Sequence, residues 1–171
     1  MSLQITPLTE TELTEATKLY KTSLQDNKKG FIQDINHREN LETMMREFRA
    51  NRGGIYILKK DTKVIGMGAL KRVDDATVEL CKLHIYPHFK GEGLGKYMAL
   101  ELIKHAKQLG YSKVVLHVTK TQKEAIGLYN KLGFRVFKQK LCQVEQGDKV
   151  LEFDTLYMER DVDYEDLIAC A

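Results

Sequence analysis

The stretch that decides the fold is residues 79–96, which read ELCKLHIYPHFKGEGLGK. Its first half predicts a buried strand, because Leu80, Leu83 and Ile85 supply apolar bulk and Pro87 ends the run. Its second half is a turn with three glycines, and the long amphipathic segment that follows predicts a helix. A strand, a glycine turn and a helix in this order can bind phosphate, since the backbone can approach the anion and the first-turn N–H groups point at it.

The spacing of the glycines excludes two common phosphate-binding motifs. A P-loop has the pattern G-x-x-x-x-G-K-[ST], but here Lys90 and Tyr97 stand at its first and last positions. A dinucleotide fingerprint has the pattern G-x-G-x-x-G, but Lys96 stands in place of its third glycine. The pattern that remains is Lys90-x-x-Gly93-x-Gly95 after a strand that ends in Ile-Tyr-Pro. The turn is therefore expected to serve another class of phosphate ligand.

The composition predicts one soluble globular domain over residues 1–171. The 171 residues can bury a sizeable core, and 43% hydrophobic with 30% charged residues is ordinary for such a domain. A net charge of +3, with the basic residues scattered, argues against a nucleic-acid partner. The three cysteines, Cys81, Cys142 and Cys170, lack metal-site spacing, which favours a reduced cytoplasmic compartment and no metal. No stretch approaches the roughly 18 apolar residues of a membrane-spanning helix, so no membrane partner is expected.

The hydrophobic periodicity predicts the element order β-α-α-β-β-β-α-β-α-β-β. Strands are expected at about 4–6, 55–59, 64–71, 77–86, 113–118, 134–144 and 150–159, and helices at about 9–24, 38–49, 93–109 and 122–132. The one obvious parallel crossover joins strands 77–86 and 113–118, so the sheet is expected to be mixed. The near-continuous apolar run at 113–118 predicts burial on both faces. Residues 25–36 look like a loop, and residues 161–171 look like a frayed acidic tail.

Two motifs of this chain resemble the GCN5-related N-acetyltransferase (GNAT) family. The pattern Lys90-x-x-Gly93-x-Gly95 is similar to that family's acyl-CoA pyrophosphate loop, R/Q-x-x-G-x-G/A, with Lys90 where Arg or Gln is usual. Residues 125–134, AIGLYNKLGF, are similar to the family's A-x-x-x-Y-x-K-x-G-F helix and turn. The predicted element order also matches the family's fold. The resemblance implies an α/β (α+β) single-domain GNAT fold, with a mixed, mostly antiparallel sheet, one splayed parallel strand pair and flanking helices.

The resemblance implies an acetyl-CoA-dependent N-acetyltransferase in which a primary amine attacks the thioester directly. Acetyl-CoA is expected between strands 77–86 and 113–118. The acceptor, a small molecule or a protein amine, is expected to enter beside residues 25–36 and the last hairpin. Whether two copies of the chain pair through that hairpin is left open. The alternative is a catalytically silent acyl-CoA-binding sensor or regulatory module. Residues 122–134 resemble the camello-like branch, many members of which carry an apolar membrane segment that this chain lacks.

The resemblance also assigns residues to acetyl-CoA. The expected binding residues are Leu83, Ile85, Lys90, Gly91, Glu92, Gly93, Leu94, Gly95, Lys96 and Gln122. Ile85 would pair its backbone with the pantetheine amides in the manner of an added strand. A plainer alternative for Lys96 is a solvated first-turn lysine, and Gln122 could instead cap its helix.

Tyr129 and Glu79 are the expected catalytic residues. Tyr129 stands at the family's tyrosine position, where a phenol can donate a proton as CoA thiolate leaves, and the plainer alternative is a packing tyrosine. Glu79 could be the general base, directly or through water, or a surface glutamate at a strand end. His117 is a minor candidate base near the end of the second parallel strand. Cys81 is expected in the core, because direct transfer requires no acyl-enzyme.

Overall fold

The computed structural model describes residues 2–26 and 37–163. One seven-stranded sheet has the order β1-β2-β3-β4-β5-β7-β6. Its strands are β1 (Leu3–Pro7), β2 (Gly54–Lys60), β3 (Lys63–Arg72), β4 (Thr77–Ile85), β5 (Lys113–Thr119), β6 (Arg135–Gln146) and β7 (Lys149–Asp161). The helices are α1 (Leu13–Asp26), α2 (His37–Ala50), α3 (Leu94–Gln108) and α4 (Lys123–Lys131), with short 3-10 turns at Glu10–Glu12 and Pro87–Phe89. The predicted element order is confirmed, while most of the expected loop and tail lies outside the described residues.

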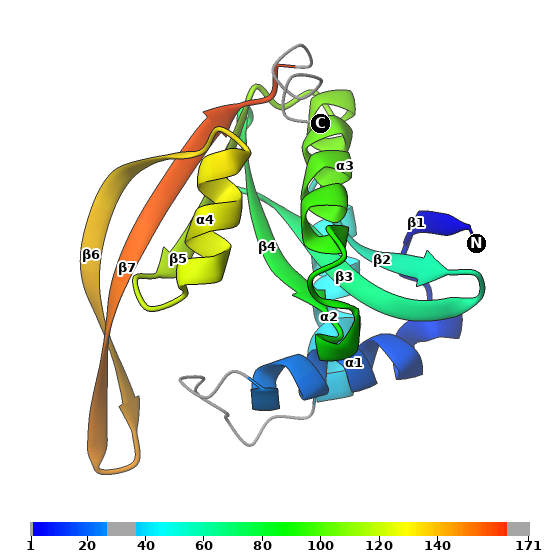
Figure 1. Cartoon of the computed structure of the whole chain (residues 1–171), viewed down its shortest axis with the longest axis horizontal. Helices are drawn as coiled ribbons and strands as arrows, with labels where there is room; N and C mark the ends of the chain where they lie inside the picture. The colour runs from blue at the N-terminus through cyan, green and yellow to red at the C-terminus, as the bar shows by residue number, and fades with distance from the viewer. Residues whose placement is uncertain (1, 27–36, 164–171) are drawn as a thin grey trace.

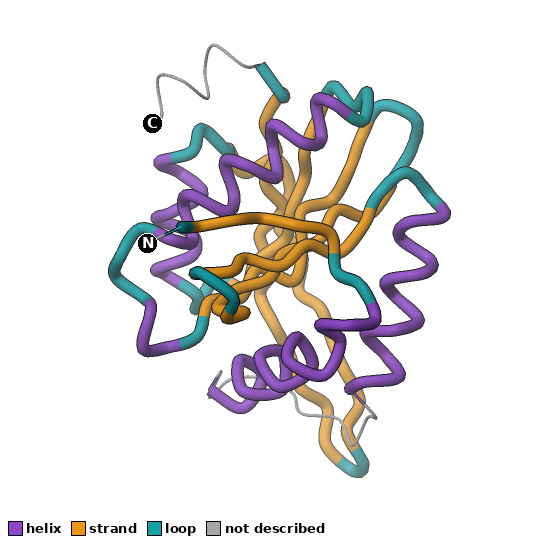
Figure 2. Tube along the Cα trace, turned by 90° about the vertical axis from the view of Figure 1, so that its right-hand side faces the viewer, coloured by secondary structure: helices purple, strands orange, loops and turns teal. Residues whose placement is uncertain are grey.

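The helices cover the two faces of the sheet in pairs, as Figures 1 and 2 show. We call these the α3/α4 face and the α1/α2 face. On the first, Val78 and Leu116 are buried in a core that also contains Met98 of α3. On the second, Met67 is buried in a separate core with Leu19 of α1. Two apolar faces on one sheet thus hold both helix pairs in place.

β4 and β5 are parallel neighbours over a short distance only. Their register pairs Thr77 with Lys113 and ends where Glu79 meets Val115, after which the two strands diverge in Figure 1. Past Glu79, no described strand pairs with β4 along this edge. The two strands therefore splay apart, and backbone groups on this edge of β4 are left without a strand partner past Glu79.

A bulge at Lys82 reverses the side-chain directions along β4. Lys82 has a left-handed φ of 55°. Before it, Leu80 faces the α3/α4 core and Cys81 packs against the α1/α2 core. After it, Leu83 and Ile85 return to the α3/α4 core. The bulge therefore lets β4 present apolar residues to the α3/α4 face along its C-terminal half.

Gly66 and Gly68 of β3 allow a close approach of neighbouring elements beside this bulge. A Cβ on Gly68 would lie 2.5 Å from Cδ1 of Leu102, and one on Gly66 would lie 2.6 Å from Cδ1 of Ile85. The β3–β4 register also skips a residue between Met67 and Ala69. Both glycines therefore let α3 and β4 pack closely on β3.

The prediction that β5 is buried on both faces is wrong. Val114, Leu116 and Val118 are buried, but His117 is exposed. On the α1/α2 face the two helices pack mainly on β2, β3 and β4. The run of apolar residues suggested a central parallel strand, yet β5 has a parallel partner over only its first residues. This arrangement leaves the His117 side of β5 open to solvent.

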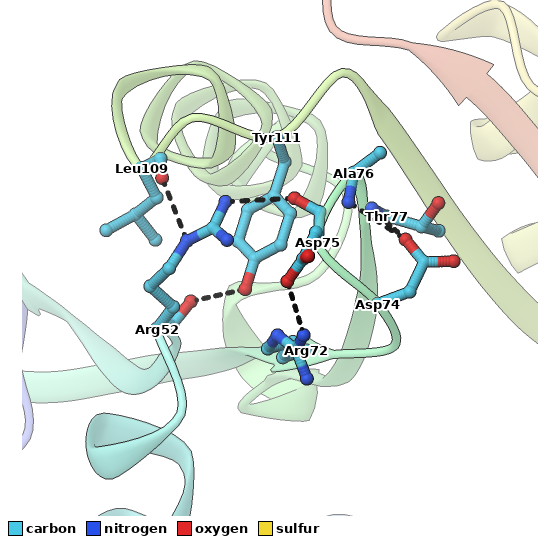
Figure 3. A network of polar contacts seen from close by, with 8 residues as sticks. All are labelled: Arg52, Arg72, Asp74, Asp75, Ala76, Thr77, Leu109 and Tyr111. Atoms are coloured by element: carbon cyan, nitrogen blue, oxygen red, sulfur yellow. Dashed lines mark hydrogen bonds and ion pairs between the residues drawn. The ribbon is translucent and has the colours of Figure 1, made fainter.

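A polar network holds the closed end of the parallel pair, as Figure 3 shows. Arg52, with a left-handed φ of 56°, donates from Nε to the Leu109 carbonyl at 3.2 Å and from Nη2 to the Asp75 carbonyl at 3.2 Å. Its guanidinium carbon lies 4.1 Å from the centroid of the Tyr111 ring. The Tyr111 hydroxyl in turn donates to the Arg52 carbonyl at 2.8 Å. Three connections, α2–β2, β3–β4 and α3–β5, are thereby joined where the strands meet.

Tyr111→Phe should lower the free energy of unfolding by about 1 kcal/mol, because it removes one hydrogen bond and leaves the Arg52 carbonyl without that donor. Urea unfolding measures the loss. Tyr97→Phe is the matched control, since the Tyr97 hydroxyl has no hydrogen bond within the described residues. Equal stability of the two variants would show that the hydrogen bond from Tyr111 to Arg52 contributes nothing to folding.

Candidate active site

The glycine turn opens into a cavity of about 300 Å³ at the carboxyl end of β4. The lining residues come from the end of β4, the turn, the start of α3 and one side of α4. They are Leu83, Ile85, Phe89, Lys90, Gly91, Gly93, Leu94, Gly95, Lys96, Glu124, Ala125, Leu128 and Tyr129. The structure therefore brings Tyr129 next to the glycine turn, although α3 and β5 separate them in the sequence.

The turn has the geometry of an anion site. Gly91 and Gly93 adopt left-handed φ values of 85° and 78°, and a Cβ on either would meet no atom within 4 Å. Gly93 is the N-cap of α3 and supplies no side-chain cap, so the first-turn N–H groups of this 15-residue helix keep their capacity to bind a ligand. Lys90 and Lys96 border the same cavity. This geometry fits a diphosphate group.

Two residues expected at the cofactor do not line this cavity. Glu92 is exposed and is absent from the lining. Gln122 precedes α4, and its Oε1 accepts hydrogen bonds from Thr119 N at 3.1 Å and Thr119 Oγ1 at 3.0 Å. Its side chain therefore stabilises the turn before α4, without a capping bond to the helix. A role for either residue in acetyl-CoA binding stays a prediction.

Four lining residues were missed by sequence reasoning. They are Phe89, Glu124, Ala125 and Leu128. The helical repeat contained the signal for Ala125, because it lies one turn before Tyr129 on the same side of α4. Phe89 follows Pro87 in a 3-10 turn, and its position depends on how that turn folds back.

Tyr129 is held as a protonated phenol. Burial above all, with a smaller electrostatic contribution from the neighbouring Cys81, raises the pKa of Tyr129 to about 12. Its ring packs edge-to-face on Phe134 at a centroid distance of 5.7 Å. The end of α4 is fixed by the buried Arg160, whose Nη1 donates to the Leu132 carbonyl. The hydroxyl can therefore act as a hydrogen-bond donor at any physiological pH.

Glu79 and His117 form a pair on the α1/α2 face. Oε1 of Glu79 lies 3.0 Å from Nε2 of His117. The hydrogen bond from His117 lowers the pKa of Glu79 below its ordinary value, and the same bond raises the pKa of His117. Sequence reasoning treated these residues as rival bases. The structure instead places them in contact where β4 and β5 begin to diverge.

Cys81 interacts electrostatically with both Glu79 and Tyr129. Burial and then the Glu79 charge raise the pKa of the Cys81 thiol to about 12, and Cys81 in turn acts on Tyr129. A thiol with this pKa is not a nucleophile at neutral pH, and Cys81 packs in the core as predicted. A protonated donor therefore lines the cavity, and an ionisable pair lies nearby where β4 and β5 begin to diverge.

Within residues 2–26 and 37–163, no three His, Cys, Asp or Glu side chains gather where they could hold a metal ion. None of the helices described there has both the length and the apolarity that a bilayer crossing requires.

Known proteins resemble this chain in sequence and in fold. Residues 13–134 match the Acetyltransferase (GNAT) family. The uncharacterized N-acetyltransferase YjgM of Escherichia coli is 28% identical over 98 residues, which are 56% of this chain and 59% of YjgM. Human N-acetyltransferase 8B is 28% identical over 117 residues, 65% of this chain and 52% of that protein. The structure of yncA from Salmonella typhimurium, solved with its cofactor acetyl-CoA, has a TM-score of 0.77 at 20% identity and covers 95% of both chains.

These similarities differ in what they establish. The yncA structure shares the fold, which confirms the predicted arrangement of a splayed parallel pair in a mixed sheet. The chain spans only 59% and 52% of the lengths of YjgM and N-acetyltransferase 8B. The likeness to N-acetyltransferase 8B, at 28% identity, does not assign the chain to a branch.

Proposed function

Because the chain belongs to the Acetyltransferase (GNAT) family, we propose that it transfers the acetyl group of acetyl-CoA to a primary amine. One observation carries the proposal: the glycine-turn cavity contains a protonated phenol, Tyr129, and the ionisable pair Glu79–His117 lies where β4 and β5 begin to diverge. A protein that only binds acyl-CoA requires the cavity but not this pair. The solved structure of yncA with acetyl-CoA supports the choice of donor.

The residues present fit acetyl-CoA, which would supply the thioester. The open left-handed turn at Gly91 and Gly93, with the first-turn amides of α3, suits its diphosphate. Lys90 and Lys96 would add positive charge there. The unpaired edge of β4 up to Ile85 suits the pantetheine amides, which can hydrogen-bond as an extra strand would.

His117 would accept the proton that the attacking amine must lose. An ammonium group has no lone pair, so a base is required before attack. The lowered pKa of Glu79 makes its carboxylate a weak base, whereas the raised pKa of His117 makes the imidazole the stronger one. Glu79 would then orient the ring and stabilise the imidazolium that forms.

Tyr129 would donate a hydrogen bond to the departing sulfur. A phenol with a pKa of about 12 is a weaker acid than an ordinary thiol, whose pKa is about 8.5. Complete proton transfer to a solvated thiolate would therefore be uphill, while a hydrogen bond to a thiolate in an apolar cavity stabilises its charge. The residue is accordingly assigned as a donor to developing negative charge.

The direct test is an amine panel with acetyl-CoA, following release of the CoA thiol. Turnover with at least one primary amine is expected, with the acetyl group found on nitrogen by mass spectrometry. Tight acetyl-CoA binding by calorimetry without thiol release for any amine would instead support the silent acyl-CoA-binding module.

Gly93→Ala should weaken acetyl-CoA binding about tenfold, as measured by calorimetry. Alanine fits sterically, but a left-handed conformation costs an L-residue about 1–2 kcal/mol and would shift the turn. Gly147→Ala is the matched control, because Gly147 has a left-handed φ of 59° and open space around it, in the β6–β7 turn. Both variants should lose similar stability, and only Gly93→Ala should lose affinity. Equal affinity in the two would remove the turn from the binding site.

Two further predictions concern the cellular location and the oligomeric state of the protein. A cytoplasmic location stays a prediction from the cysteine pattern. Pairing of two copies through the β6–β7 hairpin also stays a prediction, supported by the exposure of Phe137 and Leu141 on β6, the edge strand of the sheet.

A further inference from the structure

Two lysines flank Glu79 on the α1/α2 face. Lys71 is the direct partner of Glu79 in the antiparallel β3–β4 register, and such partners project from the same face of a sheet. Lys82 lies at the β4 bulge, and its Nζ is 5.7 Å from the ring centroid of Tyr20 in α1. Both ammonium groups therefore lie on the face that carries the Glu79–His117 pair. The charges of both lysines act on Glu79 and on His117.

Neither lysine is neutralised within the described part of the chain. Lys71 Nζ lies 5.9 Å from the ring centroid of Phe48 in α2, and neither Lys71 nor Lys82 forms an ion pair there. A contact with an aromatic face positions an ammonium group but leaves its N–H donors available. The neighbouring Lys113 differs, because its Nζ lies 3.5 Å from Glu159. Lys71 and Lys82 are thus positioned cations that share the single negative charge of Glu79 and form no close ion pair within the described residues.

The charge balance of this group discriminates among acceptors. Two lysines outweigh the one carboxylate of Glu79, so the group has net positive charge whether or not His117 is protonated. An amine that arrives as a simple cation is repelled by such a group, and a second positive charge increases the repulsion. An amine that also carries a carboxylate brings the missing negative charge.

We infer that the acceptor is an anionic amine of the amino-acid class, whose carboxylate is bound by Lys71 and Lys82 while its amino group faces Glu79 and His117. This inference rests on the proposed acetyl transfer. It makes Lys71 and Lys82 specificity-determining residues with no part in the proton transfer itself.

The first experiment compares amino acids with their α-amides, and with putrescine as a dication, in the CoA-release assay. Each acid and its amide differ in the carboxylate alone. The amide's amino group loses its proton more readily, so without charge recognition the amide would be the faster acceptor. We expect the acids to have a kcat/KM at least tenfold above their amides and putrescine to be the poorest acceptor.

The second experiment uses Lys71→Met, Lys82→Met and the double variant. For the acid acceptors, each single change should raise KM about tenfold with a smaller change in kcat, and the double variant should lose the preference for acid over amide. The KM for acetyl-CoA should not change. Lys149→Met is the control, because Lys149 is exposed at the β6–β7 turn, and it should match the wild type.

The outcomes separate the two proposals. Turnover with equal use of acids and amides, a preference for putrescine, or an unchanged acid-to-amide ratio in the double variant would overturn the anionic acceptor and keep the acetyltransferase. Acetyl-CoA binding without turnover of any amine would overturn the acetyltransferase and the inference with it. The acid-to-amide ratio of kcat/KM in the wild type tests the inference whether or not Lys82→Met folds.

Discussion

Tyr129→Phe should lower kcat for acetyl transfer by about 100-fold and leave the KM for acetyl-CoA nearly unchanged. The substitution keeps the ring and its contact with Phe134, so the cavity keeps its shape. It removes only the hydroxyl, which is protonated throughout the working range because burial raises the pKa of Tyr129 to about 12. A donor that acts on charge formed in the transition state affects kcat more than binding. The CoA-release assay at saturating acceptor measures both constants.

The control for this prediction is Tyr97→Phe on the neighbouring helix α3. Tyr97 packs against the same core but does not line the cavity. It should retain wild-type kcat. Normal turnover by Tyr129→Phe would show that the phenol has no role as donor and that Tyr129 only packs.

The second large effect is expected in the pH dependence of kcat/KM. The hydrogen bond to Glu79 raises the pKa of His117 above its ordinary value of 6.5, so the neutral, proton-accepting imidazole prevails only above that raised pKa. We therefore expect kcat/KM to rise with pH through a midpoint above 6.5 and then level off. Glu79→Gln removes the charge that stabilises imidazolium, so the midpoint should move to lower pH. The plateau should fall about 10- to 100-fold, because the base becomes weaker and less well oriented.

The acceptor amine also gains reactivity as it loses its own proton, so a third variant is needed. His117→Gln should remove from the pH profile of kcat/KM the rise caused by the imidazole and keep the rise caused by the acceptor amine. His88→Gln, a change at an exposed histidine next to Pro87, should keep the wild-type profile. An unchanged midpoint in both His117→Gln and Glu79→Gln would exclude the pair as the base.

Local patterns were enough to predict the elements and the glycine turn. The alternation along β4, the glycines at 91, 93 and 95 and the helical repeat around Tyr129 each operate within a few residues, so a single sequence contains them. The family resemblance then joined the turn to α4, which the cavity confirms as neighbours. Cavity residues on the turn could therefore largely be predicted, whereas on α4 only Tyr129 was.

What the sequence did not reveal depends on contacts between distant segments. The pairing of Glu79 with His117 follows from the register of β4 with β5. The placement of Lys71 beside Glu79 follows from the register of β3 with β4. The bulge at Lys82 could not be foreseen, because a lysine at a left-handed φ of 55° leaves no compositional signal. The exposure of His117 likewise depends on how far α1 and α2 extend over the sheet.

The Arg52–Tyr111 network has a consequence for alignment at a distance. It fixes the segments that precede β4 and β5, at the end from which the two strands diverge. A small rotation of either strand at that end would therefore move its far end by a larger distance. From Glu79 to Ile85, β4 extends about 20 Å at the usual rise per residue. A tilt of about 3° at the fixed end would move the far end by about 1 Å, which is enough to cost roughly 100-fold in rate. Residues that never touch a substrate would in this way determine how precisely the substrate-contacting residues are positioned.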